Sequence, residues 1–302
     1  MHDDDVAAMV VTPGADLQYI AGYDAKPLER LTALVIPRDG SPVLVAPALE
    51  AGEARESTFA RSGGDVITWT ETQDPFRIVA DLVYDGASGA IAVDDHMWAQ
   101  RVLRLRQVIN DRPQVLAGSI LNDLRQQKTS SEIERLQEAA AAIESVHRLI
   151  PSIVRPGMTE STVAHRISAA IIDAGHTGVD FVIVASGPNG ANPHHSVSER
   201  VIGVGDPIVI DIGGTMPGGY RSDCTRTYVI GEASADYSAA FEVLRHAQES
   251  SVAFVNGQRT CESIDAHARG LMHDHHLDGR PLDDYFIHRI GPGIGLESHE
   301  EP

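Results

Sequence analysis

The spacing of hydrophobic residues changes along the chain, and the change falls near residue 125. Before that point, residues 31–47 hold two apolar runs joined by Asp39 and Gly40, which predicts a β-hairpin. Residues 89–93 have the pattern of a short buried strand, and apolar positions recur at helical spacing over residues 97–108. The first part of the chain is therefore predicted to alternate short strands with helices.

Helical patterns open the second part of the chain. Thr129 and Glu132 have the spacing of a capping box and begin an amphipathic helix, which we predict to end before Pro151 because proline cannot continue the hydrogen-bond ladder. Thr159 caps a second predicted helix that runs to about Ala174. The boundary between the two parts is placed between residues 124 and 131.

Strand and helix patterns then alternate less regularly. An apolar strand is predicted at residues 181–184, followed by a loop rich in glycine, proline and asparagine at residues 186–195. Longer helical patterns occur at residues 237–255 and 261–272. The second part is therefore predicted to mix strands and helices.

The stretch at residues 207–227 predicts a hairpin that carries two carboxylates. A buried strand leads to Asp211, a turn follows at Pro217, and a polar strand returns through Asp223. Because Pro217 lies midway, a hairpin folded there sets Asp211 opposite Asp223. Two carboxylates so placed repel each other unless positive charge lies between them, and a divalent metal ion is the natural candidate. The alternative is that Asp223 forms an ordinary ion pair with Arg221 or Arg226.

Composition narrows the classes of partner. The chain has 302 residues, with 43 acidic against 24 basic side chains and a net charge of -19. This charge argues against nucleic acid and anionic membrane as partners, and it leaves cationic or neutral small substrates. Two cysteines are too few for a disulfide framework. The N-terminus lacks the pattern of a signal peptide and no long apolar run occurs, which favours a cytoplasmic location.

Histidines gather near this hairpin in the sequence and near the end of the chain. His194 and His195 lie in the loop before the Asp211 strand, where such a pair could move protons near neutral pH. His288 and His299 flank a glycine-rich turn that would allow the backbone to approach a ligand closely. Hard carboxylate oxygens with one or two imidazoles suit Mn, Fe, Co or Zn. A pair of such ions activates water for amide hydrolysis.

Several ordered motifs resemble one known family. The segments DIGG, SDCTRT, SGPNGANPHH and HRIGPGIGLESHEEP together resemble the pita-bread metallopeptidases, and most closely the Xaa-Pro aminopeptidase and prolidase branch. The segments MVVTPGADLQYIAGY and ERLTALVIPRDGSPVLVAP resemble the N-terminal domain of the creatinase and prolidase group. The resemblance implies an α/β N-terminal domain over residues 1–125 and an α+β pita-bread catalytic domain, C-terminally incomplete, over residues 126–302.

The resemblance also implies roles for individual residues. Asp211 and Asp223 correspond to ligands of two divalent metal ions, which would be Mn, Co, Fe or Zn. His194 and His299 correspond to catalytic residues that contact substrate and move protons, and His288 to a supporting substrate-binding group. The implied substrate is a peptide with proline at the second position, cleaved before the proline by metal-activated water. Homodimerisation is carried over from such relatives as a further expectation.

Two departures from the family pattern predict that the chain as given is inactive. Pro292 stands where the family places a metal-binding histidine, and proline has no side-chain donor. The family also continues beyond the position of Pro302 through strands that supply two glutamate ligands. Two alternatives therefore stay open: a pita-bread module that binds peptides without catalysis, and a metal-free hydrolase of C–N bonds similar to creatinase.

Overall fold

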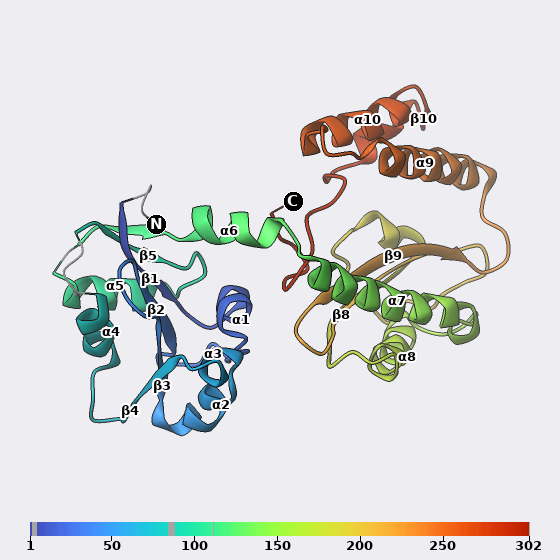
Figure 1. Ribbon diagram of the computed structural model, residues 1–302. Helices are drawn as coiled ribbons and strands as arrows, with labels where there is room; N and C mark the ends of the chain where they lie inside the picture. Colours follow the sequence, from blue (N-terminus) through green and yellow to red (C-terminus); the bar gives the residue numbers. More distant parts are fainter. Residues whose placement is uncertain (2–4, 84–87, 111, 302) are drawn as a thin grey trace. The chain divides into compact units, whose positions relative to one another are not determined.

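The computed structural model describes residues 1, 5–83, 88–110 and 112–301, and it divides into two compact units (Figure 1). Unit 1 spans Met1–Lys128 and unit 2 spans Thr129–Pro302. Unit 1 is an α/β unit built on a six-stranded mixed sheet, and unit 2 is an α+β unit built on an antiparallel sheet.

The sheet of unit 1 has the strand order β4-β3-β2-β1-β5-β6. Its strands are β1 (Val6–Val11), β2 (Ala33–Pro37), β3 (Val43–Pro47), β4 (Asp65–Trp69), β5 (Ala90–Val93) and β6 (Gln114–Leu116). The hairpin predicted around Asp39 and Gly40 is the antiparallel pair of β2 and β3. The central strand β1 is buried along its whole length, which explains why its sequence VAAMVV shows no alternation of apolar and polar residues.

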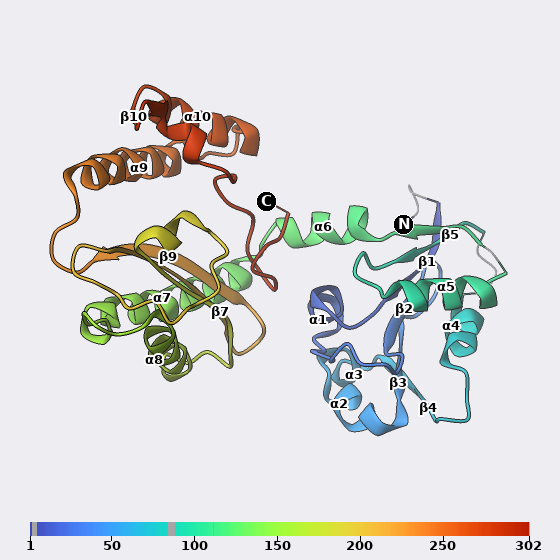
Figure 2. The ribbon, with the colours of Figure 1, turned by 180° about the vertical axis from the view of Figure 1, so that it is seen from behind.

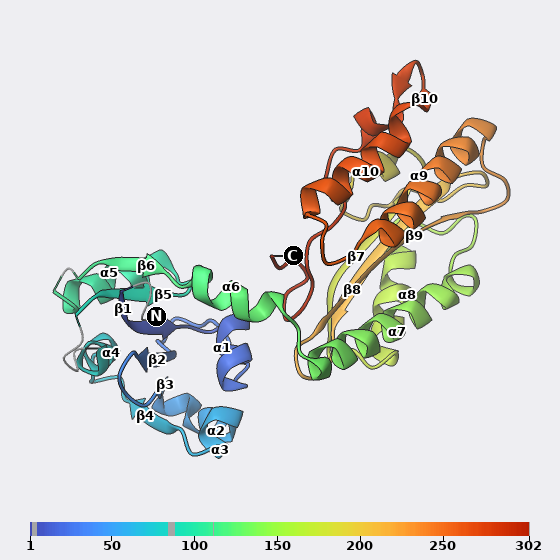
Figure 3. The ribbon, with the colours of Figure 1, turned by 45° about the horizontal axis from the view of Figure 1, so that its top comes forward.

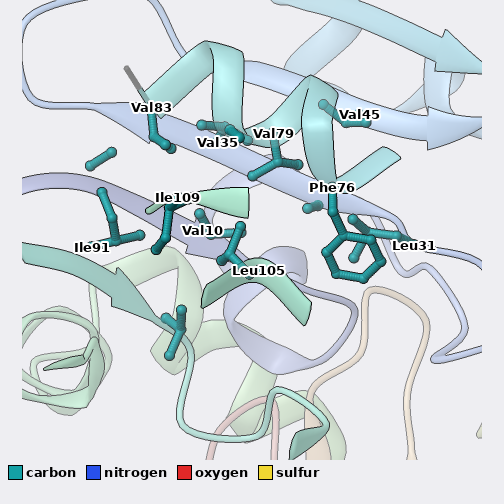
Figure 4. Close-up of a cluster of buried hydrophobic side chains, with 14 of the residues drawn as sticks. Val10, Leu31, Val35, Val45, Phe76, Val79, Val83, Ile91, Leu105 and Ile109 are labelled. Carbon is teal, nitrogen blue, oxygen red and sulfur yellow. The ribbon is translucent and has the colours of Figure 1, made fainter. Parts of the chain in front are cut away.

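Helices cover both faces of this sheet and enclose two apolar cores. The helices are α1 (Ala15–Ala21), α2 (Ala51–Glu56), α3 (Thr58–Arg61), α4 (Pro75–Val83), α5 (Ala99–Val108) and α6 (Gly118–Gln126), with a short 3-10 turn, η1 (Ala48–Glu50). Phe76 and Val79 of α4 pack with Leu105 of α5 over Val10 of β1, as Figure 4 shows. Helices α1 and α6 pack on the opposite face of β1, against Met9. Burial on both faces holds the unit together.

Unit 2 contains a three-stranded antiparallel sheet in the order β7-β8-β9. Its strands are β7 (Gly178–Ser186), β8 (Pro207–Thr215) and β9 (Arg221–Val229), and its first helices are α7 (Ser130–Ile153) and α8 (Glu160–Asp173). These helices cover one face of the sheet (Figure 2). On that face Ile208, Ile210 and Ile212 are fully buried against them. The opposite face of each strand carries the intervening residues, among them Asp211.

Helix α7 begins as predicted but ends later. Thr129 and Glu132 form the expected capping box, yet the helix runs through Pro151 to Ile153 instead of stopping before the proline. Pro151 has no N–H to donate to the carbonyl of His147 four residues earlier. The hydroxyl of Tyr228 on β9 donates to that carbonyl at 3.1 Å. The prediction was wrong because a tertiary contact satisfies the carbonyl that proline leaves without an intrahelical partner.

The remainder of unit 2 follows the sheet. A 3-10 turn, η2 (Gly187–Ala191), comes after β7, and α9 (Ala235–Phe254) and α10 (Cys261–His273) come after β9. Helices α9 and α10 pack against each other (Figure 3), with the Phe254 ring stacked on His267 at 4.3 Å between centroids. The short elements β10 (His276–Leu277), β11 (Arg280–Pro281) and η3 (Leu282–Tyr285) complete the described elements.

Candidate active site

The hairpin of β8 and β9 carries both predicted carboxylates on one face of the sheet. Asp211 pairs with Thr225 and Asp223 pairs with Gly213, so the two aspartates are diagonal neighbours. The direct pairing expected from the sequence was wrong, because the turn is centred on Gly218 and not on Pro217. Gly218 and the following glycine both have a φ of 91°, a backbone conformation that glycine adopts readily.

An apolar ring lies beside the acidic pair. Gly213 is opposite Asp223, and a Cβ at this glycine would overlap the ring of Phe181 on β7. Phe181 is itself paired with Gly213, so its ring lies across the same face of the sheet. Glycine is therefore required at position 213 by close packing. The result is an apolar surface next to carboxylates, a combination suited to a substrate with one apolar and one polar part.

The pKa of Asp223 is raised, as expected for two carboxylates that repel each other. Burial raises the pKa of Asp223, and the negative charge of Asp211 raises it further, while His299 lowers it. Asp211 accepts a hydrogen bond of 2.6 Å from the Thr225 hydroxyl. The ion-pair alternative is not observed among the residues that the structure describes, because Arg221 pairs with Asp180 at 2.7 Å and Arg226 donates to the carbonyl of Thr225 at 2.8 Å.

Removing one charge of the pair is expected to stabilise the metal-free protein. Asp223→Asn abolishes the repulsion from Asp211, so the free energy of unfolding at pH 7 should rise by up to about 1 kcal/mol, reduced by solvent screening because the side chain is 30% exposed. Since the pKa is raised in the folded state, the destabilisation appears only as pH increases through that pKa. Urea unfolding at pH 3 and pH 7 measures the difference, and an Asp223→Asn protein less stable than wild type at pH 7 would contradict it.

The closing segment of the chain is attached to β9 just before Asp223. The backbone N–H of Arg221 donates to the carbonyl of Gly295 at 2.8 Å, and its Nε donates to the carbonyl of Leu296 at 3.0 Å. Arg221 thus holds the closing segment beside the acidic pair. Its side chain in turn is fixed by Asp180.

A tight turn then brings His299 to the acidic pair. Gly293 and Glu300 form an antiparallel bridge with two backbone hydrogen bonds of 2.9 Å. A Cβ at Gly293 would lie 2.8 Å from the backbone oxygen of Glu301, so the close approach requires glycine. His299 Nε2 lies 4.0 Å from Asp223 Oδ2, and its imidazole remains largely exposed. At this distance the imidazole influences the carboxylate electrostatically without a direct hydrogen bond.

The structure separates the two histidines of the 186–195 loop. The imidazole of His195 turns inward, and its Nε2 lies 2.8 Å from a carboxylate oxygen of Glu160, which is completely buried. His194 is exposed, and within the described part of the chain its imidazole has no hydrogen-bond partner. The loop begins over the acidic face, because Gly190 lies against Val209, two residues before Asp211 on β8. Only His194 is therefore free to meet a ligand.

His288 lies in a different environment from the other predicted residues. Its ring packs edge-on against Phe286 at 4.7 Å between centroids, and its Nδ1 donates to the carbonyl of Arg289 at 2.7 Å. Its own carbonyl accepts a hydrogen bond from Arg269 of α10. None of these contacts involves Asp211 or Asp223. The substrate-binding role of His288 stays a prediction.

Sequence reasoning missed the residues that support the site. Glu160 and Phe181 carry no motif that distinguishes them, because an acidic residue at the start of a helix and an aromatic residue in a strand are both common. Their importance depends on partners far away in the sequence. Glu160 binds the loop that follows β7, and the ring of Phe181 packs against Gly213.

The donors at this face fall short of a complete metal site. Asp211 and Asp223 provide two carboxylates, but in the described ranges no group of three or more histidine, cysteine, aspartate or glutamate side chains is arranged to hold a metal ion. Pro292 supplies no side-chain donor. A structural or catalytic divalent metal ordinarily takes at least three protein ligands. The residues present therefore do not by themselves fit a complete metal site.

Comparison with known proteins identifies the family. Residues 134–302 match the model of metallopeptidase family M24, and residues 1–127 match that of the creatinase/prolidase N-terminal domain. The chain belongs to metallopeptidase family M24. The predicted family and fold class, an α/β creatinase-type unit followed by an α+β pita-bread unit, are confirmed.

This M24 chain is similar to proteins named as dipeptidases. "Probable dipeptidase PepE" of Mycobacterium tuberculosis is 44% identical over 300 residues, which cover 99% of this chain and 78% of that protein. "Xaa-Pro dipeptidase" of Lactobacillus helveticus is 31% identical over 297 residues, which cover 95% of this chain and 77% of that protein. The crystal structure of dipeptidase PepE from Mycobacterium ulcerans has a TM-score of 0.91 and 44% identity, and covers 100% of this chain and 79% of that one.

In the ranges that the structure covers, no helix combines the length and the apolar character needed to cross a membrane.

Proposed function

We propose that this chain acts on small peptides with proline at the second position and hydrolyses the bond that precedes proline. The observation that carries the proposal is the pair Asp211 and Asp223 on an open sheet face, with His299 4.0 Å from Asp223. Membership of family M24 and similarity to a protein named Xaa-Pro dipeptidase support it. The excess of acidic residues favours neutral or cationic peptides over anionic ones.

In this proposal the chain's own residues bind the peptide and move protons. His299 and His194 are assigned the roles of contacting the substrate and moving protons. Phe181 provides an apolar surface beside the carboxylates, against which a proline ring can pack. His288 is assigned a supporting role in substrate binding. A homodimer and a cytoplasmic location stay predictions.

Divalent metal enters the proposal through the two aspartates. Mn, Co, Fe or Zn would take Asp211 and Asp223 as ligands, and such ions when bound lower the pKa of water and polarise the peptide carbonyl. Pro292 has no donor to add to these two. We therefore propose that this chain binds the metal weakly and hydrolyses its substrate slowly.

A second candidate function is peptide binding without hydrolysis. The incomplete donor set favours it, because a face with two carboxylates and a neighbouring histidine can still bind a peptide when no metal is held. The intact acidic pair favours the peptidase, since a purely binding surface has no need of repelling carboxylates.

Metal content and turnover separate these functions. Purified full-length chain is analysed for bound metal, then incubated with Ala-Pro and with Pro-Ala, before and after addition of MnCl₂. Hydrolysis of Ala-Pro but not of Pro-Ala, abolished by Asp211→Asn, would support the peptidase. A high rate of hydrolysis with two bound ions would overturn the proposal that the site is weak. Calorimetric binding of Ala-Pro without turnover would support the second candidate. Neither binding nor turnover would refute both.

A further inference from the structure

The buried carboxylate of Glu160 contacts four residues of the loop that carries His194. Glu160, the first residue of α8, is 0% exposed. It accepts hydrogen bonds from the backbone N–H and the hydroxyl of Ser186, both at 2.7 Å, and from the amide of Asn189 at 3.0 Å. His195 Nε2 lies at 2.8 Å, and the hydroxyl of Ser198 donates at 2.7 Å. All four partners belong to the segment 186–198.

Helix capping does not account for this arrangement. Thr159 is the N-cap of α8, and its side chain accepts the N–H of Thr162. Glu160 lies at the first helical position and sends its side chain away from its own helix, toward the loop. Burying a carboxylate is costly, so a position that only had to stabilise the helix would be served by an exposed acid. The buried charge is instead matched by donors from a single segment.

The geometry also decides which histidine is exposed. His195 is drawn inward by Glu160, so the adjacent His194 lies at the surface of the loop. The loop is fixed at its start by Ser186, in its middle by Asn189 and at its end by Ser198. Gly190, between these points, lies against Val209 on the face that carries Asp211. Removing the carboxylate of Glu160 would therefore release the loop at Ser186, Asn189 and Ser198.

We propose that Glu160 is a positioning residue of the peptide site: it holds the 186–198 loop so that His195 is bound inside and His194 is presented to the ligand. This inference rests on the proposed function for the role of His194. It goes beyond that function by assigning a role to a residue that touches neither the acidic pair nor the ligand.

The network predicts how substitutions at Glu160 behave. One carboxylate oxygen of Glu160 accepts from Ser186 and the other from Ser198. In Glu160→Gln an NH₂ group replaces one of these oxygens, and this group donates instead of accepting. Either Ser186 or Ser198 therefore loses its acceptor. Glu160→Asp keeps the charge but shortens the side chain by one methylene group, and should retain part of the network. Val163→Ala is the matched control, because Val163 is fully buried in α8 one turn further on, in an apolar cluster whose members all lie outside residues 186–198.

Hydrogen exchange of the full-length chain tests the positioning role independently of activity. The amides of Asn192 and His195 donate to carbonyls within the loop and not to Glu160, so their exchange reports loosening of the loop. In Glu160→Gln these amides should exchange at least about tenfold faster relative to the buried amides of β8, with a smaller increase in Glu160→Asp. Val163→Ala should leave this ratio unchanged even if it lowers the melting temperature.

Binding of Ala-Pro, measured by calorimetry, links the loop to the ligand. Glu160→Gln should weaken binding by about tenfold, whereas Val163→Ala should leave it within about twofold. Unchanged relative exchange in Glu160→Gln would overturn the proposal and leave Glu160 a purely structural residue. Faster loop exchange with unchanged affinity would also overturn it, because the loop would then not position a ligand contact. If wild type does not bind Ala-Pro, the proposed function fails, and the exchange ratio alone decides whether Glu160 holds the loop.

Discussion

Replacing Ile210 by alanine is expected to lower the free energy of unfolding of unit 2 by about 3 kcal/mol. Ile210 is fully buried between β7 and β9 and packs against the helices α7 and α8. The substitution removes buried apolar atoms and leaves a cavity that strands paired on both sides cannot easily close. The loss exceeds that expected for a truncation on an exposed surface, which is usually within about 0.5 kcal/mol.

Hydrogen exchange is the appropriate measurement for this prediction. Both tryptophans, Trp69 and Trp98, lie in unit 1, so their fluorescence does not report on unit 2. Exchange of the slowest β8 amides gives the unfolding free energy of unit 2 directly. Ile133→Ala is the control, since this residue of α7 is 46% exposed. Equal effects of the two substitutions would mean that Ile210 is not in a tightly packed core.

Acidification is expected to remove about 3 kcal/mol of stability through Glu160 alone. Burial by itself raises the pKa of this carboxyl, but the hydrogen bonds donated by Ser198, Ser186 and His195 outweigh burial and lower the pKa to about 2 from its ordinary value of 4.5. Because the pKa is lower in the folded state, the stabilisation is fully present above about pH 4.5 and is lost as the pH falls toward 2.

The contribution of Glu160 is isolated by comparing two proteins. The free energy of unfolding of unit 2 is measured at pH 5, 4, 3 and 2 in wild type and in Glu160→Gln, which has no titratable group at this position. The difference between the two should shrink steadily over this range, because all other carboxyl groups are common to both. A difference that stays constant from pH 5 to pH 2 would show that Glu160 does not titrate with a lowered pKa.

Local patterns predicted those elements whose signals lie close together in the chain. The capping box of Thr129 and Glu132 depends on residues three apart, and it forms as predicted. The hairpin at Asp39 and Gly40 depends on a turn sequence between two apolar runs, and it also forms. In both cases the residues that determine the structure are neighbours in the chain, so one sequence contains the whole signal.

The sequence predicted which residues carry the chemistry of the site, but not how the strands β8 and β9 pair. Alternation along two strands placed Asp211 and Asp223 on one face, because residues two apart on a strand share a face. The turn between them contains a proline and two glycines, and several turns fit such a sequence. The glycines at 218 and 219 adopt left-handed backbone conformations, and this shifts the pairing so that the aspartates become diagonal neighbours.

The sequence by itself determined the local signals of individual helices and hairpins, the family motifs and the residue types available for chemistry, since these depend on short spacings along the chain. The tertiary structure alone decided that α7 passes through Pro151 and that Glu160 binds the loop from Ser186 to Ser198. In each case a buried polar group is satisfied by a partner far away in the chain. Such pairings follow from the packing of whole elements, because burial leaves a polar group only the partners that the fold brings to it.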